Sequence, residues 1–475
     1  MRCTRVLVPW LLAACGPPTG PANGPPPPAT SEPEIATTEQ PQPALTVVEP
    51  IPSAAPSTSA ATSEPAPNVS VTDLTGWSTF HGDSQRTGVT NAPRITKPRV
   101  RWKASVGVLS WLNSPLAVGK SVVLVPSSGE SHNKPDAKDG VYAFDFASGR
   151  RAWFAHLGAD ANGAVASKTH VFATSDDEHL YALDIKTGKV AWKAKGEGKM
   201  YTHPLLLGDR VVVGDASGYV RAFATQDGKE LWKVALNGAI RGGASSDGKN
   251  VFVGSQGGDV AALSAAGKTL WKVAGKRAPW GGKGPDEPIQ IYSPPVVDKD
   301  FVYVPFARDT YYDDLPAIHA YDKKTGALRW KAKGQGQWGN LRSTPALVMG
   351  NLVWGEPYSG DVAAIDASTG RMRYREEIGF CFFPQWSSPA VASEWVYLPR
   401  FDGSVYALNA KDGRVEWEYF LGDSKRLGQA RQKPAQKQNC DWENPDGAIY
   451  APAAVAEDGT LFVGTAEGVL YAIGN

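Results

Sequence analysis

The stretch LYALDIKTGKVAW, at residues 180–192, joins an apolar strand to a tryptophan-containing strand through a glycine turn. Six near-copies of this stretch begin at Val141, Val220, Val260, Ile318, Val362 and Val405. Successive turn glycines are 39–59 residues apart, which is the period of a four-stranded propeller blade. The intervening segments alternate apolar and polar residues, as β-strands do, and show no long helical periodicity.

An eighth copy is split between the two ends of the chain. Its first half, LYAIGN, ends at Asn475, and its second half, VRW, lies at residues 100–102. A ring of blades has unpaired edges unless one blade is built from both chain ends, and unpaired edges expose backbone donors and acceptors. The sequence therefore predicts an all-β, eight-bladed β-propeller of four-stranded antiparallel blades, closed by pairing its N- and C-terminal strands.

Each predicted outer strand carries one aromatic residue at the same place in the repeat. Burial of such a residue removes about 150 to 250 Å² from water, so we expect these side chains to pack between blades. The set comprises Trp102, Trp153, Trp192, Trp232, Trp271, Trp330, Trp417 and Tyr374.

The first residues of the chain have the features of a targeting segment. Arg2 and Arg5 precede a short apolar run that ends in Leu-Ala-Ala before Cys15, and this run is too short to span a bilayer. The arrangement resembles a bacterial lipoprotein signal, in which such a cysteine is lipidated. The alternative is an ordinary secretory signal with an incidental cysteine. Gly16, in place of Asp, favours the outer over the inner membrane by resemblance to the sorting rule of lipoproteins.

Composition divides the chain into three predicted parts. Residues 1–14 are a signal peptide. Residues 15–75 are rich in Pro, Ala, Thr and Ser and are expected to form a disordered tether. Residues 76–475 are the propeller. The net charge of +1 argues against a nucleic-acid partner, because no basic surplus is present to neutralise phosphates.

Two cysteines, Cys381 and Cys440, lie outside the signal region. Both fall in loops that enter consecutive blades, in a compartment where disulfides persist. They form either a disulfide or two free thiols.

Long insertions single out one face of the predicted propeller. They occupy residues 126–140, 276–290, 307–316 and 422–446, all in connections that reach the face opposite the glycine turns. Loops that grow on a rigid scaffold usually carry recognition. We therefore predict a binding surface at this mouth of the central channel, or alternatively a simple plug of side chains. The residues expected there are Trp111, Tyr201, Arg241, Tyr292, Trp338, Arg342, Trp386 and Tyr450.

A motif before the first repeat adds a family resemblance. Residues 77–88 contain Trp77, Phe80, His81-Gly-Asp and Gln85-Arg-Thr-Gly, and this segment resembles the opening of pyrroloquinoline-quinone-like (PQQ-like) repeat proteins. The family includes quinoprotein alcohol dehydrogenases and non-enzymatic lipoproteins, such as the assembly factor of the outer-membrane barrel-insertion machinery. The resemblance to dehydrogenases implies a pair of adjacent cysteines beside calcium and the quinone, and no Cys-Cys dipeptide is present.

The sequence thus favours a membrane-tethered envelope propeller that binds a protein partner, with no cofactor expected. The alternatives are a PQQ-dependent dehydrogenase with calcium and a polysaccharide-binding propeller that uses the same aromatic mouth.

Overall fold

The computed structural model describes residues 73–277, 287–307, 316–333, 341–356, 361–378, 387–422 and 447–475, together with Pro67, Val69 and Val71. Contacts divide the chain into two units, Met1–Pro65 and Ala66–Asn475, and every described residue belongs to the second. Within these described ranges, no helix is long and apolar enough to cross a membrane.

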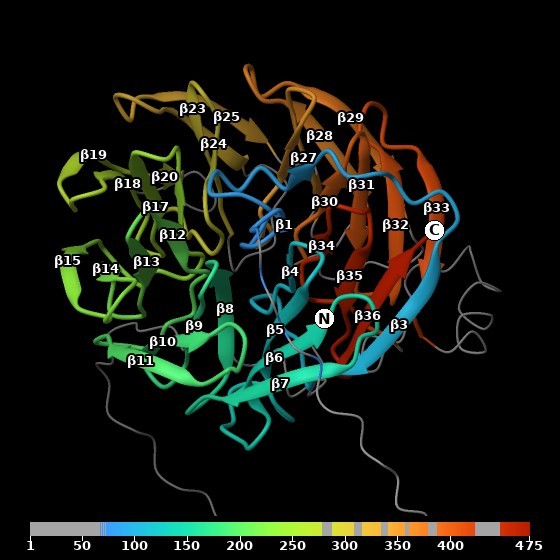
Figure 1. Cartoon of the computed structure of the whole chain (residues 1–475). Helices are drawn as coiled ribbons and strands as arrows, with labels where there is room; N and C mark the ends of the chain where they lie inside the picture. The colour runs from blue at the N-terminus through green and yellow to red at the C-terminus, as the bar shows by residue number, and fades with distance from the viewer. Residues whose placement is uncertain are drawn as a thin grey trace, which may run out of the picture. The chain divides into compact units, whose positions relative to one another are not determined.

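The described residues form eight blades of at least four antiparallel strands each, arranged in a ring (Figure 1). The prediction of an all-β, eight-bladed propeller is confirmed. The innermost strands of blades 1 to 8 are β4 (Leu116–Val118), β8 (Ala161–Ala166), β12 (Leu205–Leu207), β16 (Ala244–Ser246), β22 (Val296–Val297), β26 (Ala346–Val348), β30 (Ala390–Ala392) and β34 (Ala454–Val455).

The second and third strands of each blade supply most of its buried apolar side chains. The second strands are β5 (Val122–Ser128), β9 (His170–Ser175), β13 (Arg210–Gly214), β17 (Asn250–Gly254), β23 (Phe301–Pro305), β27 (Asn351–Gly355), β31 (Trp395–Pro399) and β35 (Leu461–Gly464). The third strands are β6 (Asp139–Asp145), β10 (His179–Asp184), β14 (Tyr219–Ala224), β18 (Asp259–Ser264), β24 (Pro316–Asp322), β28 (Asp361–Asp366), β32 (Ser404–Asn409) and β36 (Val469–Gly474).

The outer strands are more exposed and carry the repeated aromatic residues. They are β7 (Arg151–His156), β11 (Val190–Lys195), β15 (Glu230–Ala235), β19 (Thr269–Ala274), β25 (Leu328–Lys333), β29 (Met372–Glu377), β33 (Val415–Phe420) and β3 (Arg99–Ser105). Four short strands are added to this frame: β1 (Gly76–Trp77), β2 (Val89–Thr90), β20 (Lys276–Arg277) and β21 (Glu287–Pro288).

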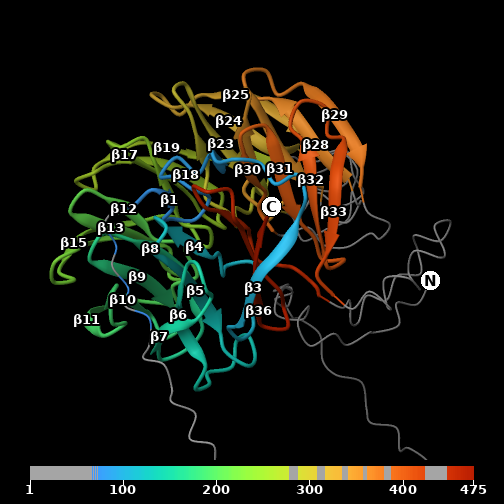
Figure 2. The same ribbon diagram turned by 45° about the vertical axis from the view of Figure 1, so that its right-hand side comes forward.

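The ring is closed by both ends of the chain, as predicted. Strand β3 pairs with β36 in an antiparallel register that places Trp102 opposite Ala472, and Figure 2 shows the two strands side by side. The last residue completes the joint, because Asn475 Oδ1 accepts a hydrogen bond of 2.7 Å from the backbone N–H of Thr96. Blade 8 is therefore completed by strands from both ends of the chain.

The repeated aromatic residue packs on a glycine turn of the next blade at seven of the eight blade boundaries, and at the eighth Trp417 Nε1 donates to Ile95 O. The Trp153 indole of blade 1 donates its Nε1–H to Ile185 O at 3.0 Å, in the glycine turn of blade 2. A Cβ on Gly188 in that turn would lie 2.6 Å from Trp153 Cε3, and Gly188 has a φ of +70°, so this position requires glycine. The same contact joins Gly149 to Trp102, Gly228 to Trp192, Gly267 to Trp232, Gly326 to Trp271, Gly370 to Trp330 and Gly413 to Tyr374.

The strand order defines two faces of the propeller. The turn face carries the glycine turns and the turns between first and second strands. The loop face carries the connections between second and third strands and between blades. The predicted insertion at 126–140 overlaps the loop-face ends of β5 and β6, that at 276–290 contains β20 and β21, and that at 307–316 joins β23 to β24. Residues 423–446 of the fourth insertion lie outside the described ranges. The predicted propeller starts at residue 76, but Val69 is already buried in the same apolar cluster as Leu116 and Val122 of blade 1.

Candidate functional site

The chain before β3 closes the central channel at the turn face. We call residues 75–90 the plug segment. It pairs with the last residues of the inner strands: Gly76 lies opposite Val118, and the N–H groups of Ser246 and Val297 donate to Ser84 O and Gln85 O. The plug segment also contacts the other blades, each through one of its own residues and one residue of the blade. These pairs are Thr79 with Val165 of blade 2, Arg86 with Pro204 of blade 3, Thr87 with Leu347 of blade 6, Gly88 with Val391 of blade 7, and Thr75 with Glu457 of blade 8.

Arg86 fixes the plug segment to the ring through a fully buried guanidinium group. Its Nη1 donates to Thr79 Oγ1 at 2.6 Å and to Phe80 O at 2.7 Å. Its Nε and Nη2 donate to the carbonyls of Ala244 and Pro204, each at 3.2 Å. Burial lowers the pKa of Arg86 to about 10, which leaves it charged at neutral pH. Four acceptors on three chain segments, the plug segment and the starts of blades 3 and 4, therefore share one cation.

His81 fixes the far end of the same segment. Its Nδ1 lies 2.6 Å from Arg86 O and its Nε2 lies 2.9 Å from Pro389 O in blade 7. Burial lowers the pKa of His81 to about 4. The neutral ring has a single N–H, so it can donate to only one of these two carbonyl oxygens. The motif that suggested a family resemblance thus has a structural role: it seals one end of the channel.

The opposite mouth of the channel, at the loop face, carries stacked arginine and tyrosine residues contributed by neighbouring blades. The Arg241 guanidinium lies 4.0 Å from the Tyr201 ring centroid, and that of Arg342 lies 4.7 Å from the Tyr292 ring centroid. Tyr201 and Arg241 are half-buried, whereas Tyr292 and Arg342 are buried at 9% and 8% exposure. The structure thus brings together four of the predicted mouth residues in two pairs.

The other predicted site residues are not part of these two arginine–tyrosine pairs. Two of them lie in the described ranges and the rest lie outside these ranges. Trp111 is half-buried ahead of β4, and the Tyr450 ring packs on Phe401 with centroids 4.7 Å apart. Five predicted site residues fall outside the described ranges and stay predictions: Cys15, Trp338, Cys381, Trp386 and Cys440.

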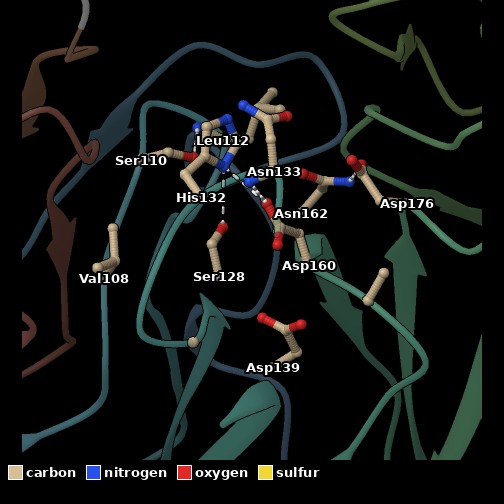
Figure 3. Close-up of polar contacts among 12 residues, drawn as sticks. Val108, Ser110, Leu112, Ser128, His132, Asn133, Asp139, Asp160, Asn162 and Asp176 are labelled. Atoms are coloured by element: carbon tan, nitrogen blue, oxygen red, sulfur yellow. Dashed lines mark hydrogen bonds and ion pairs between the residues drawn. The ribbon is translucent and has the colours of Figure 1, made fainter. Parts of the chain in front are cut away.

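Polar contacts continue beside the mouth from blade 1 to blade 4, and Figure 3 shows the part from His132 to Asp176. Asp160 Oδ2 lies 2.8 Å from His132 Nδ1. Asn162 Nδ2 donates to Asp176 Oδ1 at 2.8 Å, and Asp176 Oδ2 accepts from Lys199 Nζ at 3.0 Å. Lys199 then lies over the Tyr201 ring, which Arg241 also covers.

Asp160 is the mouth residue of blade 2, and the sequence analysis did not identify it. It precedes Ala164, where the regular pairing of β8 resumes after a bulge, by four residues, as Tyr201 precedes Leu205 in β12. The run Asp-Ala-Asn-Gly at 160–163 is typical of a turn, which concealed its role. Counting back from each inner strand would have found it.

The contacts of this region are not those of a hydrolytic triad. Ser128 Oγ and Asp160 Oδ2 both contact Nδ1 of His132, at 3.3 and 2.8 Å, whereas a relay needs the serine and the carboxylate on opposite ring nitrogens. Within the described residues, no group of three or more His, Cys, Asp or Glu side chains is arranged to hold a metal ion.

Comparison with known proteins assigns the family. The family model described as outer membrane protein assembly factor BamB matches residues 137–304 and 216–380, which together span about half of the chain. The chain belongs to this family. The matched residues include Tyr201, Arg241, Tyr292 and Arg342, whereas Trp111, Trp386 and Tyr450 lie outside them.

Individual proteins agree with this assignment. The BamB of Burkholderia pseudomallei strain K96243 is 26% identical over 382 residues, covering 78% of this chain and 86% of that protein. The crystal structure of BamB from Moraxella catarrhalis aligns with a TM-score of 0.57 and 17% identity, over 80% of this chain and 100% of that one. A europium-containing methanol dehydrogenase aligns with a TM-score of 0.62 and 15% identity, over 85% and 99%. At these identities the two structures show a shared fold alone.

Proposed function

We propose that this protein is a recognition propeller of the bacterial envelope that binds a protein partner at its loop-face mouth, in outer-membrane protein assembly. One observation carries the proposal: the plug segment covers the turn-face ends of the inner strands, whereas the half-buried pair of Tyr201 and Arg241 lies at the loop-face end, where a partner can reach it. Membership of the BamB family supports the assembly role.

The Arg241 and Tyr201 pair is suited to binding. Arginine and tyrosine are enriched at the residues that dominate binding energy in protein interfaces. Arg241 stacks on Tyr201 and its Nε contacts Gln256 Oε1 at 3.4 Å, so its side chain is partly ordered before a partner arrives, and less entropy is lost on binding. Its Nη groups can then donate to carboxylate or carbonyl oxygens of the partner.

We further propose that Cys15 carries a lipid that anchors the chain, with outer-membrane attachment favoured, and that residues 15–75 are the tether. The lipoprotein-like sequence around Cys15 supports this. A single acyl chain gives only marginal membrane binding, so a diacylated cysteine is the arrangement that would hold the propeller at the membrane.

Site-specific photocrosslinking in intact cells tests the partner. A photoreactive amino acid at Tyr201 or Arg241 is expected to capture one dominant envelope protein. The same amino acid at Lys249 or Asp300, which are exposed on the turn face, is the matched control and is expected to capture none. Equal capture at both faces, or no protein adduct at the mouth, would overturn the proposal. Glycan binding that depends on Tyr201 would then identify a polysaccharide instead.

A further inference from the structure

Two buried carboxylates, Asp139 and Asp160, meet where the loop between β5 and β6 packs on the start of β8. They are 0% and 1% exposed. Asp139 Oδ2 accepts from the backbone N–H of Asp136 at 2.8 Å, and Asp160 Oδ2 accepts from that of Asn133 at 2.8 Å. The Oδ1 atom of each carboxylate is buried without a hydrogen-bond partner. In Figure 3 the carboxyl group of Asp139 points toward Asp160.

A third oxygen without a partner belongs to Asn162, which is 0% exposed. Its Nδ2 donates to Asp176 Oδ1 and to Met200 O, at 2.8 and 2.9 Å. Both of these atoms are acceptors, so the amide cannot be flipped, and its Oδ1 must face away from them. That Oδ1 is also buried without a hydrogen-bond partner, and Figure 3 places the Asn162 side chain beside Asp160.

Cationic side chains in contact with these two carboxylates are few among the residues that the structure describes. Among the described residues, no lysine or arginine forms an ion pair with Asp139 or Asp160, and the only ion-pair partner is His132, which contacts Asp160. Burial, and after it the charge of Asp160, raise the pKa of Asp139 to about 6. Buried charges in proteins are normally paired or coordinate a metal ion.

We propose that Asp139 Oδ1, Asp160 Oδ1 and Asn162 Oδ1 bind a hard cation of the calcium class. Calcium takes about six to eight oxygen ligands in flexible geometry, which suits two carboxylates, one amide and water better than the strict octahedron of magnesium does. This site has only two acidic ligands, and its third ligand is an amide. It is therefore not one of the groups of three or more His, Cys, Asp or Glu side chains considered above. A bound cation would fix the loop at residues 129–138 to the inner strand of blade 2.

Calcium titration of the purified full chain tests this site and does not depend on the partner proposed above. After removal of divalent cations with chelator at pH 7.5, calorimetry with Ca²⁺ is expected to show one site per chain. The expected Kd is roughly 0.1 to 1 mM, the range of extracellular calcium modules. The melting temperature is expected to rise on Ca²⁺ addition, because a ligand that binds only the folded state stabilises it.

Two isosteric variants and one control make the result decisive. Asp139→Asn and Asp160→Asn are each expected to weaken Ca²⁺ binding at least about tenfold. They should also raise the melting temperature of the cation-free protein, because each removes an unbalanced buried charge. Asp300→Asn, on the exposed turn face, should leave both quantities unchanged. Absence of Ca²⁺ binding in the wild-type chain, or equal binding in the Asp160→Asn chain, would overturn the proposal.

Discussion

At the scale of single residues, the repeat is defined by the contact between a glycine and the tryptophan of the preceding blade. Gly188 and Gly208 both have positive φ, at +70° and +62°, but only Gly188 has a neighbour that a Cβ would strike. Gly188→Ala is therefore expected to lower the free energy of unfolding by about 2 to 4 kcal/mol, from backbone strain and displacement of Trp153.

Gly208→Ala serves as the control for that substitution, since a Cβ there meets nothing within 4 Å. It should cost only the strain of a left-handed alanine, about 1 to 2 kcal/mol. Urea titration followed by tryptophan fluorescence measures both variants. Equal losses would show that the packing against Trp153 contributes nothing beyond backbone strain.

Glu356 gives a residue-scale prediction of pH dependence. It is 3% exposed, its Oε1 has no hydrogen-bond partner, and burial raises its pKa to about 7. A carboxyl group with a raised pKa in the folded state stabilises the protein fully below its unfolded pKa of about 4.5, and this contribution is lost as pH rises through 7. Glu356→Gln should therefore be more stable than wild type at pH 8, by up to about 3 kcal/mol.

The same comparison at pH 4 provides the internal control for Glu356→Gln. Both side chains are then neutral, so the two unfolding free energies should agree within about 1 kcal/mol. A stability difference that is constant from pH 4 to pH 8 would contradict the raised pKa, because a uniform difference cannot come from ionisation of this carboxyl group.

At the scale of elements, the blades could be predicted from sequence and the plug segment could not. The repeat contains a turn glycine and an aromatic residue, and the glycine of one blade contacts the aromatic residue of the preceding blade. The spacing of these residues in the sequence therefore predicts where one blade ends and the next begins. The plug segment occurs once. Its side chains bond mainly to backbone carbonyls, such as Ala244 O and Pro389 O, whose positions carry no sequence signal. A resemblance identified the motif, but only the fold shows that it seals the channel.

Removal of the Arg86 cation should release the plug segment. Arg86→Met fills similar volume but leaves Thr79 Oγ1, Phe80 O, Ala244 O and Pro204 O without their donor. The expected loss is on the order of 3 to 5 kcal/mol of unfolding free energy, with faster hydrogen exchange at the amides of residues 75–90. Arg414→Met, at an exposed ion pair, should cost no more than about 1 kcal/mol. Unchanged exchange in Arg86→Met would show that the plug is held by other contacts.

At the scale of the whole molecule, the candidate site was predicted only in outline. The loop face and four of its stacked residues followed from insertion positions and from the place of each residue before an inner strand. The pairing of Tyr201 with Arg241, and of Tyr292 with Arg342, depends on which side chains of neighbouring blades approach, and repeat spacing does not encode that approach. Asp160 was missed because its local sequence is that of a turn.

The proposed anchor makes a prediction for the intact protein in cells. Cys15→Ser removes the thiol that would carry the lipid, so the chain should move from the membrane fraction to the soluble fraction of the envelope. Fractionation and immunoblotting measure this, and Cys3→Ser, within the expected signal peptide, is the matched control. Retention of Cys15→Ser in the membrane fraction would show that attachment does not require Cys15.

The pairing of β3 with β36 also sets the order of events when the protein is made. The outer strand of blade 8, β3, is synthesised among the first strands, and the other three strands of this blade are synthesised last. Strand β3 therefore cannot pair with β36 until almost the entire chain has been synthesised. A chain interrupted before β34 to β36 has at most seven complete blades, and β3 has no strand to pair with. Synthesis of the last strands is thus a condition for closing the ring.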